Sequence, residues 1–315
     1  MKVVPIIMDP VLDVPIMNAS GVHCTMLEEL RALGRSDCDA MVTKSMTLEP
    51  RGGNPEPRFF ASDEFTINSM GLPNPGVGYY VEHAGELAEL GKPLTANVAA
   101  LRTEDFLPTL SLALPHFDRF EVNLSCPNIG GKGVFAYDFE LLESILSQLR
   151  ASTDKPLGIK LPVYTQLHHI TQVARILRAT GMDFITLVNG FGTACAIDID
   201  NECMAIKPNG GIGGMGGGAI KPIALAHIAL FRHELGDEMP IIGVGGIASG
   251  EDAYAFVLAG ASALQIGSAL WTEGLGIFTR VKDELRAIMR QKGIEKLSDK
   301  IGMVGQCDSP EARLR

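Results

Sequence analysis

The sequence predicts an α/β protein with the architecture of a (β/α)8 TIM barrel. Three observations predict it: short apolar runs recur eight times, amphipathic segments separate them, and polar residues close the runs. Continuously apolar strands that alternate with helices indicate a parallel sheet, and eight of them are typical of a closed barrel. Periodicity alone leaves an open, doubly wound sheet as the alternative. We expect residues 1–315 to form a single barrel domain.

The expected elements follow one another along the whole chain. The predicted strands cover residues 16–20, 40–44, 94–98, 120–123, 157–160, 184–188, 240–244 and 263–266. Amphipathic segments long enough to cross over and return are predicted as helices at residues 138–151, 169–180, 220–235 and 251–259.

The composition indicates a soluble protein that binds small molecules. The chain has 315 residues, 46% of them hydrophobic, and a formal net charge of -10. Such acidity disfavours a nucleic-acid or anionic-membrane surface, which needs clustered Lys and Arg. The N-terminal residues do not resemble a signal peptide, and no apolar run approaches the roughly 20 residues of a membrane span, so we expect a cytoplasmic location. The six cysteines contain no CxxC pair and the histidines lack metal-ligand spacing, so we expect no metal site.

Polar residues close the predicted strands, and in such barrels the active site lies at the carboxyl ends of the strands. A single lysine at this position could simply be a side chain that reaches solvent at the rim. Several polar strand ends together instead predict a site, and they are Ser20, Lys44, Asn97, Asn123, Lys160 and Asn189.

Cys126 is the candidate catalytic residue. It lies just after a predicted strand, between the carboxamides of Asn123 and Asn128. A positioned thiol has an ordinary pKa of about 8.5 and can transfer protons near neutral pH. A buried structural thiol is the alternative interpretation.

Two glycine-containing turns predict a phosphate site. Gly245-Gly246 and Gly267-Ser268 follow the last two strands, where backbone N–H groups can approach a phosphate closely. A third glycine-rich run, residues 210–218, is read either as a flexible or tightly turned loop or as backbone packed against a flat cofactor. Flavin mononucleotide (FMN) suits these features better than a nicotinamide, because no complete dinucleotide motif is present. Pyridoxal phosphate stays open, since Lys44 or Lys160 could form a Schiff base.

At this point the sequence resembles a known family. The segments NASG (18–21), KS (44–45), GNPEPR (53–58), NSMGLPN (68–74), NLSCPN (123–128), IKP (206–208) and GVGG (243–246) are similar to those of dihydroorotate dehydrogenases. The resemblance runs from about residue 10 to about residue 295 and is strongest to the soluble, fumarate-dependent class 1A.

The resemblance implies FMN-dependent oxidation of dihydroorotate to orotate in pyrimidine biosynthesis, with fumarate as electron acceptor, in a homodimer. Cys126 would remove the C5 proton while hydride passes from C6 to flavin N5. Membrane-associated class 2 enzymes have serine at this position. A related flavin-dependent pyrimidine oxidoreductase and a non-catalytic FMN-binding barrel with another ligand remain alternatives.

The resemblance also assigns binding residues. The substrate would be held by Lys44, Asn68, Met70, Gly71, Leu72, Asn123, Asn128, Asn189 and Gly190. The cofactor would contact Ser20, Lys44, Ser45, Asn123, Lys160, Val188, Gly217, Gly245, Gly246, Gly267 and Ser268.

Three segments depart from the family pattern or stand outside it. Gly190 replaces the serine that usually follows Asn189, which removes a side-chain donor to the substrate. The segment 127–137, expected to gate the site, has Gly130 and Gly133 where prolines are common, which predicts a more mobile loop. The polar tail at residues 308–315 is expected to be disordered.

Overall fold

The computed structural model describes residues 12–125 and 134–305, and its centre is an eight-stranded parallel sheet. The strand order is β1-β14-β13-β8-β7-β6-β5-β2, and a bridge between Met17 and Ala40 joins the two ends of the sheet. The sheet is therefore a (β/α)8 barrel, which excludes the open sheet. Its strands are β1 (Ile16–Asn18), β2 (Met41–Val42), β5 (Leu94–Val98), β6 (Arg119–Asn123), β7 (Leu157–Leu161), β8 (Phe184–Leu187), β13 (Ile241–Val244) and β14 (Ala263–Ile266).

All eight predicted strands are confirmed, and β6 shows how their residues divide between two faces. Phe120 and Val122 are fully buried in the main hydrophobic core, together with Leu142 and Leu146 of the adjacent helix. Glu121 lies between them and accepts hydrogen bonds from other barrel strands, so its side chain faces the interior. The outer face therefore supplies packing, whereas the inner face can carry polar groups.

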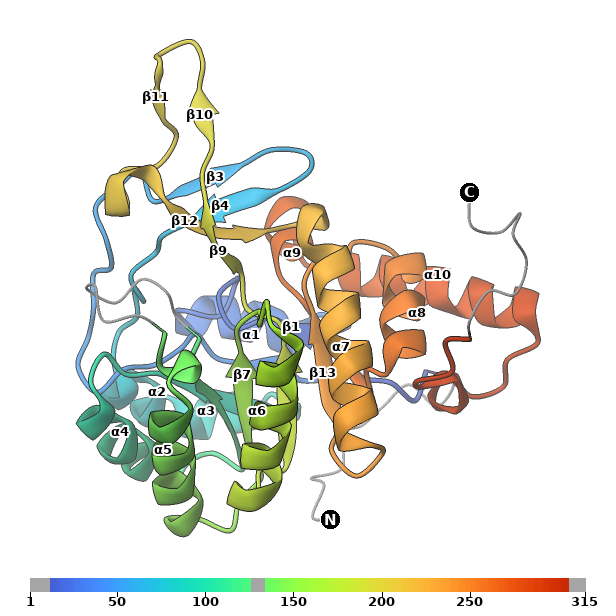
Figure 1. Ribbon diagram of the computed structural model, residues 1–315, viewed down its shortest axis with the longest axis horizontal. Coiled ribbons are helices and arrows are strands. Elements are labelled where there is room, and N and C mark those ends of the chain that lie inside the picture. Colours follow the sequence, from blue (N-terminus) through green and yellow to red (C-terminus); the bar gives the residue numbers. More distant parts are fainter. Residues whose placement is uncertain (1–11, 126–133, 306–315) are drawn as a thin grey trace.

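Helices form the outer layer around the barrel (Figure 1). The predicted helices are confirmed as α5 (Phe139–Ala151), α6 (Leu167–Thr180), α7 (Lys221–Leu235) and α8 (Gly250–Ala259). The others are α1 (Leu27–Arg35), α2 (Val77–Glu82), α3 (Ala84–Ala88), α4 (Phe106–Ala113), α9 (Ser268–Glu273) and α10 (Ile277–Lys292). Short 3-10 turns lie at η1 (Thr103–Asp105), η2 (Phe135–Tyr137), η3 (Pro208–Gly211), η4 (Gly218–Ile220) and η5 (Leu297–Lys300).

Side-chain caps define two of the predicted helix starts. Asp138 accepts a hydrogen bond from the backbone N–H of Leu141 at the start of α5, and Ser249 caps α8 in the same way. Such caps satisfy backbone donors that the first helical turn leaves unpaired. The observed starts of α5 and α8 agree with the predicted ones to within one residue.

A second, antiparallel sheet lies at one end of the barrel (Figure 1). Its strand order is β3-β4-β12-β9, and a two-stranded hairpin of β10 and β11 projects beyond it. The strands are β3 (Phe59–Ala61), β4 (Thr66–Asn68), β9 (Phe191–Ala194), β10 (Ile197–Asp198), β11 (Cys203–Met204) and β12 (Gly213–Gly216). The sequence did not predict these elements.

The glycine-rich run at 210–218 is not a loop throughout, because its central residues form β12. Gly214 and Gly216 pair with Asn68 and Thr66 of β4. A Cβ atom on Gly213 would lie 2.5 Å from the carbonyl oxygen of Asn68, so only glycine permits this close approach of the two backbones. The interpretation as a flexible loop is therefore wrong for residues 213–216.

In the ranges 12–125 and 134–305, none of the helices has the length and apolar character that crossing a membrane requires. The tail at 308–315 lies outside the described residues.

Candidate active site

A cavity of about 400 Å³ lies between the carboxyl ends of the barrel strands and the antiparallel sheet. Its walls come from both layers, because the last residue of β6 and residues after β2 and β8 share it with residues of β4 and β12. Every described residue that the resemblance assigns to the substrate or the cofactor lines this cavity, whereas Asn97, another predicted strand-end residue, does not. Those that line it are Ser20, Lys44, Ser45, Asn68, Met70, Gly71, Leu72, Asn123, Lys160, Val188, Asn189, Gly190, Gly217, Gly245, Gly246, Gly267 and Ser268. The predicted Cys126 and Asn128 lie outside the described residues.

Two lysines lie in the inner wall of the cavity. Only 7% of Lys44 and 5% of Lys160 are exposed, so neither lysine extends into solvent at the barrel rim. The Lys44 ammonium lies 3.4 Å from the carbonyl oxygen of Gly21. Burial lowers the pKa of Lys160, and the carboxylate of Glu121 opposes this shift. Two buried cations make this wall suited to an anionic ligand.

Amide and hydroxyl groups are connected across the strand ends. The carboxamide of Asn123 donates to Ser45 Oγ at 3.1 Å, and Ser45 Oγ lies 3.3 Å from Ser20 Oγ. Ser125 Oγ donates to Asn123 Oδ1 and accepts from Asn189 Nδ2 at 2.9 Å. These bonds fix the orientation of both asparagine carboxamides at the cavity wall. Sequence reasoning had not assigned Ser125 a role.

The NSMGLPN segment adopts unusual backbone conformations at the cavity. Leu72 is buried with φ of 57°, and Gly71 has φ of 73°. A Cβ atom on Gly71 would lie 2.4 Å from Asn54 Oδ1, so glycine is required there. Non-glycine residues rarely adopt positive φ, and such strain is concentrated at functional sites. The first asparagine of this segment, Asn68, lies with its Nδ2 3.4 Å from the carbonyl oxygen of Gly214.

Gly190 presents backbone rather than a side chain to the cavity. Its N–H donates to Asn189 Oδ1 at 3.0 Å, which helps to orient that carboxamide. A Cβ atom at this position would lie 3.2 Å from the carbonyl oxygen of Met215, so a larger residue would press against β12.

Glu121 is a charged residue that sequence reasoning missed. It is fully buried on β6 beneath the cavity, where three side chains donate hydrogen bonds to its carboxylate. A signal was present in the sequence, because a glutamate inside the apolar run 120–122 lies two residues before Asn123 and thus on the same strand face.

An aromatic pair at the cavity was also missed. Phe59 of β3 and Trp271 of α9 both line the cavity, and their ring centroids are 4.6 Å apart. Trp271 is the only tryptophan of the chain and is half-exposed. The nearby hydroxyls of Thr66 and Ser268 lie 3.2 Å apart and connect β4 to the start of α9. Sequence patterns gave no signal for this pair, since it joins residues more than 200 positions apart.

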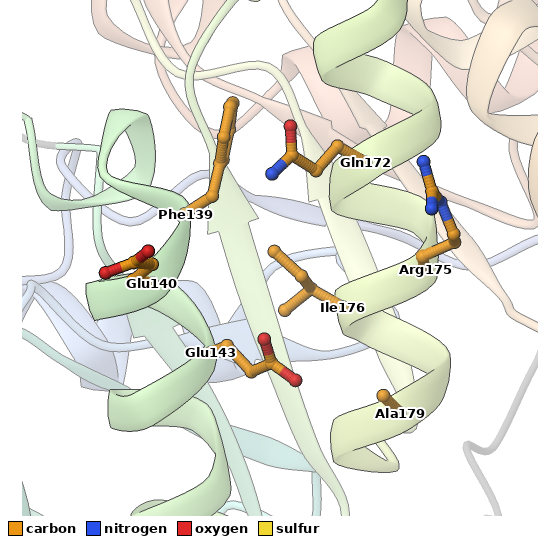
Figure 2. A pocket seen from close by; sticks show the side chains of 7 residues that line it. All are labelled: Phe139, Glu140, Glu143, Gln172, Arg175, Ile176 and Ala179. Carbon is orange, nitrogen blue, oxygen red and sulfur yellow. The ribbon is translucent and has the colours of Figure 1, made fainter.

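A second, smaller cavity of about 270 Å³ lies on the outer surface between α5 and α6. Figure 2 shows Phe139, Glu140 and Glu143 on one helix opposite Gln172 and Arg175 on the other. None of the predicted site residues lines it, which separates it from the cavity at the strand ends. Within residues 12–125 and 134–305, no cluster of His, Cys, Asp and Glu has the arrangement of a metal site.

Comparison with known proteins identifies the family. A family model described as dihydroorotate dehydrogenase matches residues 6–289. The chain belongs to this family. Members of the dihydroorotate dehydrogenase family are flavin-dependent oxidoreductases.

Curated relatives within the family are similar over almost their whole length. The chain is 41% identical over 304 residues to dihydroorotate dehydrogenase (fumarate) of Trypanosoma cruzi, covering 95% of this chain and 96% of the relative. It is 44% identical over 291 residues to dihydroorotate dehydrogenase A (fumarate) of Lactococcus lactis subsp. cremoris, covering 90% and 93%.

Solved structures from the family share the fold. A dihydroorotate dehydrogenase from Eimeria tenella in complex with ferulenol matches with a TM-score of 0.78 at 22% identity, covering 94% of this chain and 89% of that chain. Its ligand-free form matches with a TM-score of 0.79. At this low identity the likeness supports the barrel architecture alone.

Proposed function

We propose that this protein oxidises dihydroorotate to orotate in pyrimidine biosynthesis, with FMN as cofactor and fumarate as electron acceptor. The observation that carries the proposal is the cavity, because every described residue that the resemblance assigns to the substrate or the cofactor lines it. The names of the similar enzymes, dihydroorotate dehydrogenase (fumarate), support the same substrate and acceptor.

The residues of the cavity fit a phosphorylated flavin. Gly217, Gly245 and Gly246 have φ of 83°, 122° and 89°, and they expose backbone along one wall. A Cβ atom on Gly246 would lie 2.7 Å from Lys221 Cβ, so side chains are excluded where a phosphate would approach. When bound, FMN supplies the N5 atom that accepts the hydride.

The protein's own groups would bind and orient both molecules. Carboxamides offer donors and acceptors that match the alternating N–H and C=O groups of the pyrimidinedione ring, so Asn68, Asn123 and Asn189 suit the substrate. The buried ammonium of Lys44 would attract the substrate carboxylate. Lys160 would stabilise negative charge on the N1 and O2 side of the reduced flavin.

Flavin absorbance tests the proposal directly. The purified protein should be yellow, and dihydroorotate added without oxygen should bleach it. Fumarate should then restore the colour faster than NAD or a quinone does. Dihydrouracil, which lacks the carboxylate, serves as control, because its efficient oxidation would favour a related pyrimidine oxidoreductase. A bound flavin that none of these substrates reduces would favour the non-catalytic barrel.

Cys126 is proposed as the base that removes the C5 proton. Replacing Cys126 by Ala should keep the bound FMN but slow its reduction by dihydroorotate about 10²–10⁴-fold, the usual contribution of a positioned base. Stopped-flow absorbance of wild type and variant measures this change. A variant that reduces its flavin at a near-normal rate would remove Cys126 from the mechanism.

A homodimer in the cytoplasm is also proposed, from the resemblance to soluble class 1A enzymes. The projecting β10–β11 hairpin supports an interface, because Ile197, Ile199 and Met204 expose apolar surface there. Sedimentation of wild type and an Ile199→Asp variant tests this, and a monomeric wild type would contradict it. Cell fractionation tests the location.

A further inference from the structure

Glu121 forms the centre of a polar cluster inside the barrel. Its carboxylate accepts hydrogen bonds from Asn97 Nδ2 at 2.5 Å, Thr186 Oγ1 at 2.5 Å and Gln265 Nε2 at 3.1 Å. These donors lie on three other strands, β5, β8 and β14, and all are buried. Both oxygens of the carboxylate are therefore hydrogen-bonded inside the barrel, by three neutral donors.

Lys160 is next to this cluster on the inner face of the barrel. It lies two residues further along β7 than the partner of Glu121, toward the cavity. In the strand register it is paired with Asn123 on β6 and with Thr186 on β8, the residue whose hydroxyl donates to Glu121. Glu121 is paired with Gly158, two residues before Lys160 on the same face. The two charges are thus neighbours, although they form no direct ion pair among the bridges between described residues.

The other titratable groups around Lys160 do not compensate its charge. Lys44 repels it, and the nearby Cys24 thiol is neutral, because burial raises its pKa to about 11. Burial lowers the pKa of Lys160, whereas Glu121 raises it. Among the described residues near Lys160, Glu121 is therefore the anion that favours the ammonium form.

We propose that Glu121 is a positioning residue that keeps the Lys160 side chain in its ammonium form. Glu121 would thereby maintain the positive charge of Lys160 next to the flavin. Its carboxylate lies too deep to contact a ligand of the cavity, since it is fully buried and satisfied by three donors. It acts instead on the cation that faces the cavity. The inference rests on the proposed flavin function and extends it to a residue with no contact to substrate or cofactor.

Sulfite binding to the flavin-loaded protein provides a test that does not depend on turnover. Sulfite adds reversibly to N5 of oxidised flavin and bleaches it, and a cation on the N1 and O2 side stabilises the negative charge of the product. The dissociation constant, corrected for the ionisation of sulfite, is measured from pH 6 to pH 9. Wild type should bind sulfite with nearly constant affinity over this range.

The decisive variant is Glu121→Gln. At pH 6 it should bind sulfite as tightly as wild type or more tightly, because Lys160 is still charged and a negative charge has been removed. At pH 9 it should bind about tenfold or more weakly, since one unit in pKa corresponds to a tenfold change. Affinity that follows the wild-type profile, or rises equally at every pH, would overturn the proposal.

A second substitution separates charge from structure. Arginine stays protonated in proteins, so in a Lys160→Arg background Glu121→Gln should no longer weaken binding at pH 9. A loss that persists in the double variant would indicate a structural effect and would contradict the proposal.

The glutamine variant is compatible with the fold. Asn97 Oδ1 and Gln265 Oε1 are buried without a hydrogen-bond partner, so either amide can turn to accept from the new glutamine. If the variant still fails to fold, the wild-type titration decides: tenfold weakening between pH 6 and pH 9 would show that Glu121 does not hold the charge. Protein that carries no flavin at all would instead refute the proposed function.

Discussion

Lys282 and Lys160 are both buried lysines, but their ammonium groups meet different surroundings. Lys282 on α10 donates to Asp39 Oδ1 and to the carbonyl oxygen of Asp37, each at 2.6 Å. The second oxygen of Asp39 accepts from the backbone N–H of Ile16 at 2.8 Å. Both charges of this pair are thus bound by protein groups, and the pair connects α10 to the barrel.

Lys160 has no comparable set of partners among residues 12–125 and 134–305. The neighbouring Glu121 is already bound by three neutral donors, and Lys160 lines the cavity. Burying a charge is costly unless hydrogen bonds or an opposite charge compensate it. We infer that a fully paired buried charge stabilises the fold, whereas an incompletely paired charge at a cavity is available to a ligand.

Lys160→Met should impair chemistry and spare the fold. Removing a cation that stabilises developing charge typically costs on the order of 10²–10³-fold in rate. Stability should change by about 1 kcal/mol or less, because no direct ion pair is broken and an apolar side chain fills the space. Stopped-flow reduction of the bound flavin and urea unfolding measure the two quantities.

The proposed difference between the two lysines would be wrong if Lys160→Met lost as much unfolding free energy as a variant of the Lys282–Asp39 pair. It would also be wrong if flavin reduction stayed at the wild-type rate. Lys160→Arg is the matched control, since it keeps the charge and should lose much less activity than the methionine variant.

Lys282→Met should show the opposite behaviour. Removing one partner of a buried ion pair leaves Asp39 uncompensated, which typically costs 3–5 kcal/mol of unfolding free energy. Flavin reduction by the folded fraction should be unchanged, because the pair lies outside the cavity.

The double variant Asp39→Asn with Lys282→Met tests whether an uncompensated buried charge causes this loss of stability. It removes the uncompensated charge, so it should recover much of the lost stability, and urea unfolding of the four proteins completes the cycle. A double variant that is less stable than either single variant would argue against a buried charge penalty.

The barrel could be predicted from the sequence, but the sheet that covers it could not. The barrel strands are short, mainly apolar runs with a polar residue or a glycine near the carboxyl end, so their pattern is local. In contrast, β12 consists of Gly213–Gly216 and pairs with β4 almost 150 residues earlier. Its glycines signal a loop in isolation, and only the close approach of β4 explains them.

The residues of the candidate site also fall into those that could be predicted from the sequence and those that could not. Strand-end residues such as Lys44 and Asn123 were found, because the barrel topology requires such ends to converge. Phe59 and Trp271 were missed, since their contact depends on the unpredicted sheet and on a helix after the last strand. Glu121 was missed because a buried carboxylate has meaning only once its donors on three other strands are known.

The last prediction concerns the pH dependence of stability that arises from Cys24, a neutral group in the same surroundings as Lys160. Burial raises the pKa of its thiol from 9.0 to about 11. Below pH 9 both the folded and the unfolded chain keep this proton, so its contribution to stability is fully present. Between pH 9 and pH 11 the unfolded chain loses the proton and the folded chain retains it, which favours unfolding by about 1.4 kcal/mol per pH unit.

Comparison with Cys24→Ala isolates this contribution from the other groups that titrate at high pH. Wild type should be more stable than the variant at pH 8, because the alanine leaves a small void in the core. The difference should shrink by about 2–3 kcal/mol as the pH rises to 11, since only wild type has the thiol. Urea unfolding under reducing conditions measures it. A difference that stays constant would mean that the thiol ionises as it does in water, and that the surroundings shared with Lys160 disfavour charge less than burial implies.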